Sequence, residues 1–203
     1  MNEKDFKKRI AFIDAYNTAN TTEKLLGFVV DWKKLHTYLL EEWNCEKIFF
    51  YSGVEIGDNE TEKEYELLKS LRCEMRIKTT IPYKRKDKKV SIECAKCGYV
   101  NIETISMGYE KKSNCDVELT VDALEEAEKN SHFLIFTGDG DFDYLVRLLV
   151  EKNVFVTFVS NMGKNKITPR RFSTKLKILL KENNKVKFID INTWKLKIQR
   201  ENV

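Results

Sequence analysis

The chain has 203 residues, of which 42% are hydrophobic, and a formal net charge of +4 at neutral pH. That length and composition support one sizeable hydrophobic core, and only two prolines and eight glycines argue against a disordered or linker-rich chain. The longest apolar runs, 25–30 and 154–159, have six residues each and are far too short to span a membrane.

We therefore expect a soluble single domain over 1–203 with no membrane association. The N-terminal segment is charged and lacks the apolar core of a secretory signal. The five cysteines, an odd number, are typical of a reducing compartment. Together these features predict a cytoplasmic location.

Short apolar runs alternate with segments of helical periodicity along most of the chain. Strands are predicted at 10–13, 47–51, 75–79, 133–136, 154–159 and 186–191. Helices are predicted at 22–43, with an interruption near Gly27, and at 60–71, 116–129, 142–151 and 173–180. This alternation predicts an α/β fold with three layers, α/β/α, around a mainly parallel sheet with right-handed crossovers.

The segment at about 82–110 differs from the rest of the chain. It begins with a basic run at 84–89, alternates apolar and polar residues, turns at Cys94-Ala95-Lys96-Cys97-Gly98, and alternates again to 105. Alternation on both sides of a turn is typical of a β-hairpin. We expect an inserted hairpin that projects from the domain, and a C-terminal extension at about 160–203.

Acidic residues follow two of the predicted strands and open one helix. Asp14 follows the first strand, Asp116 begins the helix after the insertion, and Asp139 and Asp141 follow the strand at 133–136. Taken singly, each is explained as a turn or cap residue. If the first and central strands are neighbours, however, these carboxylates meet at the carboxyl edge of the sheet, where parallel-sheet proteins bind ligands.

Clustered carboxylates favour Mg²⁺ or Mn²⁺, which bind through a few carboxylates together with substrate phosphates. Asn17 is placed to hydrogen-bond the substrate or a ligand carboxylate. Asp143 lies in the first turn of a helix and is interpreted as complementing the helix dipole. Asp122 lies about 240° around its helix from Asp116, and we place it behind the site.

Three segments carry a resemblance to a known family. Ile13-Asp14-Ala15-Tyr16-Asn17, Lys112 with 114–122, and Thr137-Gly138-Asp139-Gly140-Asp141-Phe142 with Leu145-Val146 resemble the three motifs of the NYN domain, in its LabA-like branch of the PIN-like nuclease superfamily. The resemblance covers about 10–159 in the right order. Ala15 and Ser113 stand where the family often has glycine.

This resemblance implies a Rossmann-like (PIN-like) fold and an Mg²⁺- or Mn²⁺-dependent ribonuclease that hydrolyses RNA phosphodiester bonds. The implied catalytic carboxylates are Asp14, Asp116, Asp139 and Asp141, with Asp14, Asp116 and Asp139 as metal ligands. Asn17 would support them, and Lys112 belongs to the second motif.

Basic residues on both sides of the acidic motifs indicate a polyanionic substrate. The lysines of 84–89, together with Lys112, Arg170 and Arg171, are candidates for contacts with an RNA backbone. Tyr83, Tyr99, Tyr109 and Phe172 are candidates for base stacking, although a place in the core explains each of them as well.

Cys94 and Cys97 form a knuckle of the kind that supplies half of a zinc site. The other candidate ligands in the chain are Cys45, Cys73, Cys115, His36 and His132. Three interpretations stay open here: a zinc site within the chain, reduced thiols in a hairpin turn, and a knuckle shared across a homodimer.

Two other functions compete with the ribonuclease. One is an RNA-binding or regulatory module that keeps the fold with little catalysis. The other is a different Mg²⁺-dependent phosphotransfer enzyme of Toprim or haloacid-dehalogenase type. Asp14 disfavours the second, because the dehalogenase type has another Asp two residues on and the Toprim type has Glu in place of Asp14.

Overall fold

The computed structural model describes residues 6–55, 57–112, 114–163 and 172–201. Within them the central sheet has six strands in the order β10-β9-β8-β1-β2-β3, and every neighbouring pair is parallel. The strands are β1 (Arg9–Asp14), β2 (Lys47–Val54), β3 (Glu74–Thr79), β8 (His132–Phe136), β9 (Phe155–Ser160) and β10 (Val186–Asp190). The predicted three-layer α/β fold with a parallel sheet is confirmed.

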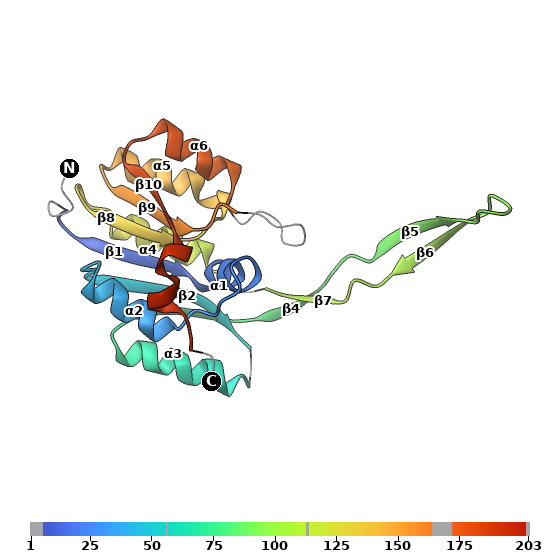
Figure 1. Cartoon of the computed structure of the whole chain (residues 1–203), viewed down its shortest axis with the longest axis horizontal. Coiled ribbons are helices and arrows are strands. Elements are labelled where there is room, and N and C mark those ends of the chain that lie inside the picture. The colour runs from blue at the N-terminus through green and yellow to red at the C-terminus, as the bar shows by residue number, and fades with distance from the viewer. Residues whose placement is uncertain (1–5, 56, 113, 164–171, 202–203) are drawn as a thin grey trace.

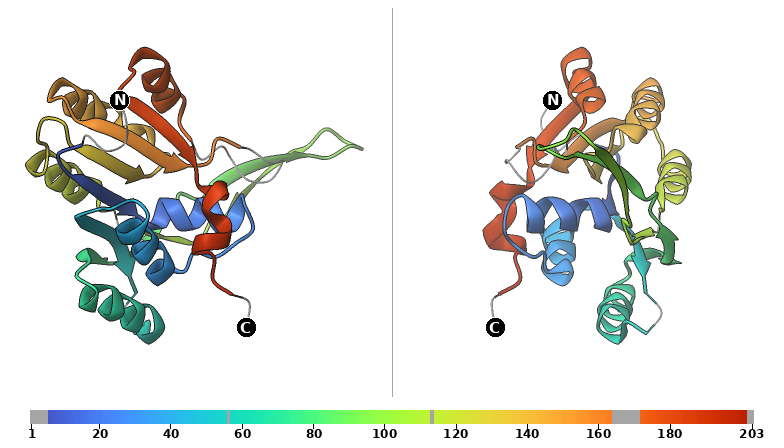
Figure 2. Two further views of the ribbon diagram at one scale, coloured as in Figure 1. Left: turned by 60° about the vertical axis from the view of Figure 1, so that its left-hand side comes forward. Right: turned by 90° about the vertical axis from the view of Figure 1, so that its right-hand side faces the viewer.

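Helices cover both faces of this sheet (Figures 1 and 2). One face carries α4 (Asp116–Glu125), α5 (Asp143–Glu151) and α6 (Thr174–Glu182). The other carries α1 (Ala15–Lys24), α2 (Trp32–Glu41), α3 (Asn59–Ser70), the 3-10 turn η2 (Ile191–Trp194) and α7 (Lys195–Ile198). Because each strand alternates its side chains between two apolar layers, strands such as β1 and β8 are continuous apolar runs in the sequence.

The strand order creates one topological switch point. Successive connections run outward from β1 to β2 and β3, and from β8 to β9 and β10, so β1 and β8 are adjacent while their connections diverge. In open parallel sheets, ligands bind in the crevice at the carboxyl ends of the two strands that flank such a point. Here those ends are Asp14 and the loop that follows Phe136.

The interruption predicted near Gly27 in the helix at 22–43 is confirmed and separates two helices, but the predicted start at residue 22 is wrong. α1 begins at Ala15, directly after Asp14, and ends near Gly27, whose φ of +71° is a left-handed conformation. α1 is buried partly through Thr18, Thr21 and Thr22, whose hydroxyls bond to backbone carbonyls, and polar residues do not register as a helical stripe. Asp31 then caps α2.

The inserted segment is a long β-ribbon that projects from the domain (Figure 1). β4 (Ile81–Lys84) pairs with β7 (Tyr109–Lys112) at its base, and β5 (Lys88–Glu93) pairs with β6 (Val100–Ile105) toward its tip. The predicted hairpin was therefore correct in kind, but it contains two paired sections and spans 81–112. We call this segment the arm.

The C-terminal segment takes part in the main fold. β10 forms an edge of the central sheet, and Ile191, Trp194 and Ile198 are buried against the face that carries α1 and α2. Among the helices that the structure describes, none combines the length and the apolar character needed to cross a membrane.

Candidate functional site

Asp14 stands at the end of β1 and also caps α1. One of its carboxylate oxygens accepts the backbone N–H of Asn17 at 3.0 Å, and the other accepts the hydroxyl of Thr137 at 3.2 Å. Burial, and the nearby charges of Asp116 and Asp139, raise the pKa of Asp14 to about 6, despite these two hydrogen bonds. The fold therefore holds a carboxylate in place where its charge is unfavourable without a cation.

The loop after β8 brings Asp139 to the same edge. The side chain of Asp139 caps the 3-10 turn η1 (Gly140–Phe142) by accepting the backbone N–H of Asp141 at 3.0 Å. Its own N–H donates to Thr137 Oγ1 at 3.2 Å, while Gly138 N–H donates to the side-chain oxygen of Asn17 at 3.0 Å. The loop is thus tied to β1 and α1 through Thr137 and Gly138, directly before Asp139.

Position 140 accepts only glycine without a shift of its surroundings, because Ser173 lies very close to the place that a Cβ would take. A Cβ at Gly140 would lie 2.3 Å from the hydroxyl oxygen of Ser173 and 2.9 Å from its Cβ. Ser173 caps α6 and donates its N–H to the carbonyl of Gly138 at 2.9 Å. The loop that carries Asp139 and Asp141 is therefore packed tightly against the start of α6.

Asp116 is the first residue of α4, and Asn114 holds its carboxylate. The amide nitrogen of Asn114 donates to Asp116 at 2.7 Å, and the backbone N–H of Asp116 donates back to the Asn114 side chain at 2.7 Å. Lys78 of β3 braces the segment by bonding the Asn114 carbonyl and Glu118, each at 2.8 Å. Burial raises the pKa of Asp116, and so do the charges of Asp139 and Asp141.

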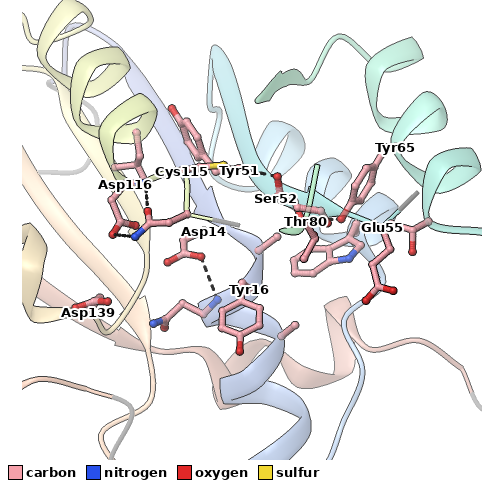
Figure 3. A pocket seen from close by; sticks show the side chains of 18 of the residues that line it. Asp14, Tyr16, Tyr51, Ser52, Glu55, Tyr65, Thr80, Cys115, Asp116 and Asp139 are labelled. Carbon is pink, nitrogen blue, oxygen red and sulfur yellow. Dashed lines mark hydrogen bonds between the residues drawn. The ribbon is translucent and has the colours of Figure 1, made fainter. Parts of the chain in front are cut away.

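Asp14, Asp116 and Asp139 line one pocket of about 600 Å³ (Figure 3). Asp141, which is exposed on η1, acts on Asp116 through its charge. In the part of the chain that the structure describes, none of these four carboxylates forms an ion pair. Among the described residues, no Lys or Arg forms an ion pair with the acidic end of the pocket.

A hard divalent cation suits this donor set. Among the described residues, no three Asp, Glu, His or Cys side chains are grouped closely enough to hold an ion between them. Mg²⁺, however, keeps several waters and usually takes one or two carboxylates with substrate phosphates. The charge of Asp116 raises the pKa of Asp14, and the charge of Asp139 raises the pKa of both, so a cation among them would lower the cost of ionising Asp14 and Asp116.

The other end of the pocket is aromatic and polar (Figure 3). Tyr16, Trp32 and Tyr65 line it together with Ser52 and Thr80. Tyr16 is 64% exposed beside Asp14, whereas the hydroxyl of Tyr65 lies 2.6 Å from that of Ser52. Exposed aromatic rings of this kind are surfaces on which unpaired bases can stack.

The remaining predicted site residues support the pocket, lie away from it or fall outside the described residues. Asn17 uses its side-chain oxygen to hold Gly138. Lys112 ends β7, but its side chain lies outside the described residues, as do Arg170 and Arg171. Cys94 and Cys97 lie at the exposed tip of the arm, away from the pocket.

Asp122 and Asp143 lie outside the acidic cluster, as predicted. Asp122 is buried, accepts the Tyr51 hydroxyl at 2.9 Å and forms an ion pair with Arg76 at 3.0 Å. Asp143 lies in the first turn of α5 and pairs with Arg147. Stacking by Phe172 is contradicted, because this side chain is fully buried in the core.

The sequence pattern did not predict two residues that hold the carboxylates in place. Thr137 bridges Asp14 and Asp139, and Asn114 fixes Asp116. Both lie within two residues of a predicted carboxylate and inside the segments that resemble the family motifs. A Thr or Asn beside an acid is common, so this signal is weak without the geometry.

The sequence pattern of the NYN domain matches residues 9–177, most of the chain. The "Low amplitude and bright protein LabA" of Synechococcus elongatus is 34% identical over 55 residues, which cover 27% of this chain and 30% of LabA. The match thus spans less than a third of that relative.

A crystal structure of a protein of unknown function from Vibrio parahaemolyticus has the same fold, with a TM-score of 0.59 and 22% sequence identity. The similarity covers 93% of this chain and 96% of that protein.

Proposed function

This chain belongs to the NYN domain family of the PIN-like nuclease superfamily, and we propose that it is a ribonuclease that depends on Mg²⁺ or Mn²⁺. The observation that carries the proposal is the meeting of Asp14, Asp116 and Asp139 in one pocket at the switch point of a parallel sheet. Asp14 and Asp116 have raised pKa values and no ion pair among the described residues, which favours a metal-assisted reaction on a phosphate.

Asp14 and Asp116 are the residues that would hold the ion, with Asp139 and Asp141 orienting water or further ligands around it. When bound, a divalent ion polarises the phosphoryl oxygen and makes water a better nucleophile. Thr137, Asn17 and Asn114 act as positioning residues, because each fixes a carboxylate or its loop. Positioned acids of this kind hold a phosphodiester in line for attack by water.

The arm supplies a reason to expect a polyanion as the substrate. The segment 81–112 contains eight Lys and Arg and four Asp and Glu, so its net charge of +4 equals that of the whole chain. Its base joins the domain beside the pocket, since Thr80 and Asn114 line it directly before β4 and after β7. An RNA backbone that follows the positively charged part of the arm next to the domain would reach the carboxylates.

The aromatic end of the pocket favours a base that is not paired. Tyr16 presents an exposed ring beside Asp14, and Trp32 and Tyr65 line the wall beyond it. Bases of single-stranded RNA stack on such rings, whereas paired bases are not available for stacking. We propose single-stranded RNA as the preferred substrate, with Tyr16 as the first stacking partner.

The test is an incubation of the protein with labelled single-stranded RNA, RNA duplex and single-stranded DNA of one sequence, with Mg²⁺ or Mn²⁺. We expect cleavage of the single-stranded RNA that EDTA abolishes and that added metal restores. Cleavage that persists in EDTA would contradict the proposal.

The second candidate is an RNA-binding module with little catalysis, and the absence of a three-ligand metal cluster among the described residues favours it. Salt-sensitive RNA binding without cleavage in either metal would support this candidate and exclude the ribonuclease.

A further inference from the structure

The tip of the arm is a two-cysteine knuckle. The N–H of Gly98 donates to the carbonyl of Cys94 at 2.9 Å, and the N–H of Cys94 donates to the carbonyl of Tyr99 at 2.8 Å. Gly98 has a φ of +70°, a left-handed conformation that closes this turn and that other residues rarely adopt. The turn brings the thiols of Cys94 and Cys97 together on the exposed end of the ribbon.

The knuckle also holds the two sulfur atoms beside each other. The backbone N–H groups of Lys96 and Cys97, and the thiol of Cys97, donate to the sulfur of Cys94. These contacts fix the position of the Cys94 sulfur next to that of Cys97. Two cysteines provide half of the four ligands that a structural zinc site requires.

The rest of the described chain does not complete this site. Each of the other candidate ligands is buried in the domain: Cys45, Cys73, Cys115, His36 and His132. The arm carries its tip well away from that domain (Figure 1). Among the described residues, no group of three metal-binding side chains exists at the tip. The zinc site within one chain that the sequence left open is therefore excluded for these ligands.

The outer part of the arm is an isolated ribbon that exposes apolar side chains. Ile92 is 51% exposed, Ile102 is 65% exposed and Ile105 is 48% exposed. β5 and β6 pair with each other, and all residues from 91 to 107 are exposed. A two-stranded ribbon of this kind is at best marginally stable in water. A partner that covers it, or an ion that clamps its tip, would stabilise it.

Charge distribution along the arm favours a second copy of the chain as this partner. The outer part, 90–105, has one Lys and two Glu, whereas the inner part carries seven Lys and Arg and two acids. The arm tips of two copies can therefore approach without strong repulsion, while the positively charged inner parts of the two arms remain apart. Lys96 of each knuckle would also offset part of the negative charge of a site with four thiolates.

We propose that a single zinc ion joins the arm tips of two copies, with Cys94 and Cys97 of each copy as its four ligands. The thiol protons are released to solvent on binding. The contact is isologous, because a two-fold axis through the ion relates the two knuckles. The proposal is independent of the nuclease activity.

The test measures metal content and mass on the full chain, purified without a histidine tag under reducing conditions. We expect one zinc per two chains and a particle of twice the 23.9 kDa chain mass. After removal of zinc, titration with Co²⁺ should show the visible absorption of tetrahedral thiolate coordination and saturate at one ion per two chains. Chelation should give monomers.

The variant is Cys94→Ser with Cys97→Ser, and the matched control is Ala95→Ser in the same exposed turn. The double variant should be monomeric and free of zinc with an unchanged circular dichroism spectrum, whereas Ala95→Ser should keep the dimer and the ion. One zinc on a monomer, no zinc at all, a disulfide between Cys94 and Cys97 in place of metal, or a dimer that survives the double substitution would each overturn the proposal.

Discussion

The hydroxyl of Thr137 donates a hydrogen bond to the carboxylate of Asp14 at 3.2 Å, and so joins the ends of β8 and β1 across 123 residues of sequence. The hydroxyl oxygen of Thr137 also accepts the backbone N–H of Asp139, at 3.2 Å. One buried side chain therefore sets the distance between two of the acids. A substitution of Thr137 can therefore separate an effect on the positions of the two carboxylates from an effect on the stability of the fold.

We expect Thr137→Val to lower RNA cleavage about tenfold or more, because an acid displaced by a fraction of an ångström loses its alignment. The lost hydrogen bonds should also reduce the free energy of unfolding by about 1–2 kcal/mol. The control is Thr22→Val, which removes another fully buried hydroxyl, one that bonds to carbonyls within α1. Equal losses of activity in both variants at equal stability would contradict a positioning role.

Asp14→Asn should stabilise the protein in the absence of metal. The charge of Asp14 is unfavourable because of burial and of Asp116 and Asp139, whereas asparagine can still cap α1 without that charge. We expect the free energy of unfolding at pH 7.5 to rise by about 1–2 kcal/mol, measured in urea with EDTA. Asp31→Asn, a cap of α2 with the same geometry, should not show this gain.

The pH dependence of stability should contain a contribution from His132. Burial, and the charge of Arg9, lower the pKa of His132 to about 4 in the folded protein, and its ring nitrogens are hydrogen-bonded to Arg9 and Thr157. Because the unfolded chain takes up a proton near pH 6.5 and the folded protein does not, stability falls as the pH drops below 6.5. The loss from this residue is about 2 kcal/mol between pH 7 and pH 5.

Urea unfolding of wild type and His132→Gln at several pH values isolates this contribution. Asp14 has a raised pKa and acts with the opposite sign, but it is present in both proteins. The difference between the two proteins should therefore shrink by about 2 kcal/mol as the pH falls from 7 to 5. A difference that is independent of pH would show that His132 does not remain neutral in the fold.

Gly140→Ala should reduce both activity and stability. The added Cβ would meet Ser173 at 2.3 Å from its hydroxyl oxygen, and relief requires the loop or the start of α6 to move. We expect a loss of about 1–3 kcal/mol in unfolding free energy and a clear loss of cleavage. Ser173→Gly in the same chain removes both clashing atoms and should recover part of each loss. No recovery would exclude this clash as the cause.

The arm should carry most of the salt dependence of RNA binding. Each phosphate contact that is lost should lower the slope of log K against log salt by about 0.7 for a single strand. The variant replaces with glutamine the basic residues Lys84, Lys86, Lys88 and Lys89. The control makes the same change at exposed lysines elsewhere, Lys33, Lys63, Lys69 and Lys181. An equal change of slope in both proteins would contradict a specific role for the arm.

The sequence was sufficient to predict the layers, because β1 and β8 are continuous apolar runs of a doubly covered sheet. It was also sufficient to predict that Asp14 and Asp139 lie at one edge of the sheet, since they follow strands that are neighbours. It was not sufficient to predict the helix boundary at Ala15, because α1 is buried partly through threonines that bond to their own helix.

The supporting contacts were beyond the reach of the sequence for a related reason. Thr137 and Asn114 act through side-chain hydrogen bonds, one to a residue 123 positions away and one to a residue two positions away, and neither kind of bond leaves a periodic pattern in the sequence. The sequence also did not show which aromatic side chains are exposed to solvent. Tyr99 and Tyr109 are 71% and 70% exposed on the arm, whereas Phe172 is buried, although all three were stacking candidates with a core alternative.

The most direct test of the central claim is cleavage of a labelled single-stranded RNA, in Mn²⁺ and in Mg²⁺, by wild type, Asp14→Asn, Asp139→Asn and the control Asp31→Asn. We expect Asp14→Asn and Asp139→Asn to lose at least about a hundredfold in rate while RNA binding stays within a few-fold of wild type, because each removes a charge that acts on the reacting phosphate. Asp31→Asn should cleave as wild type does. Cleavage that survives in both site variants, or that is absent from the wild type in either metal, would contradict the account.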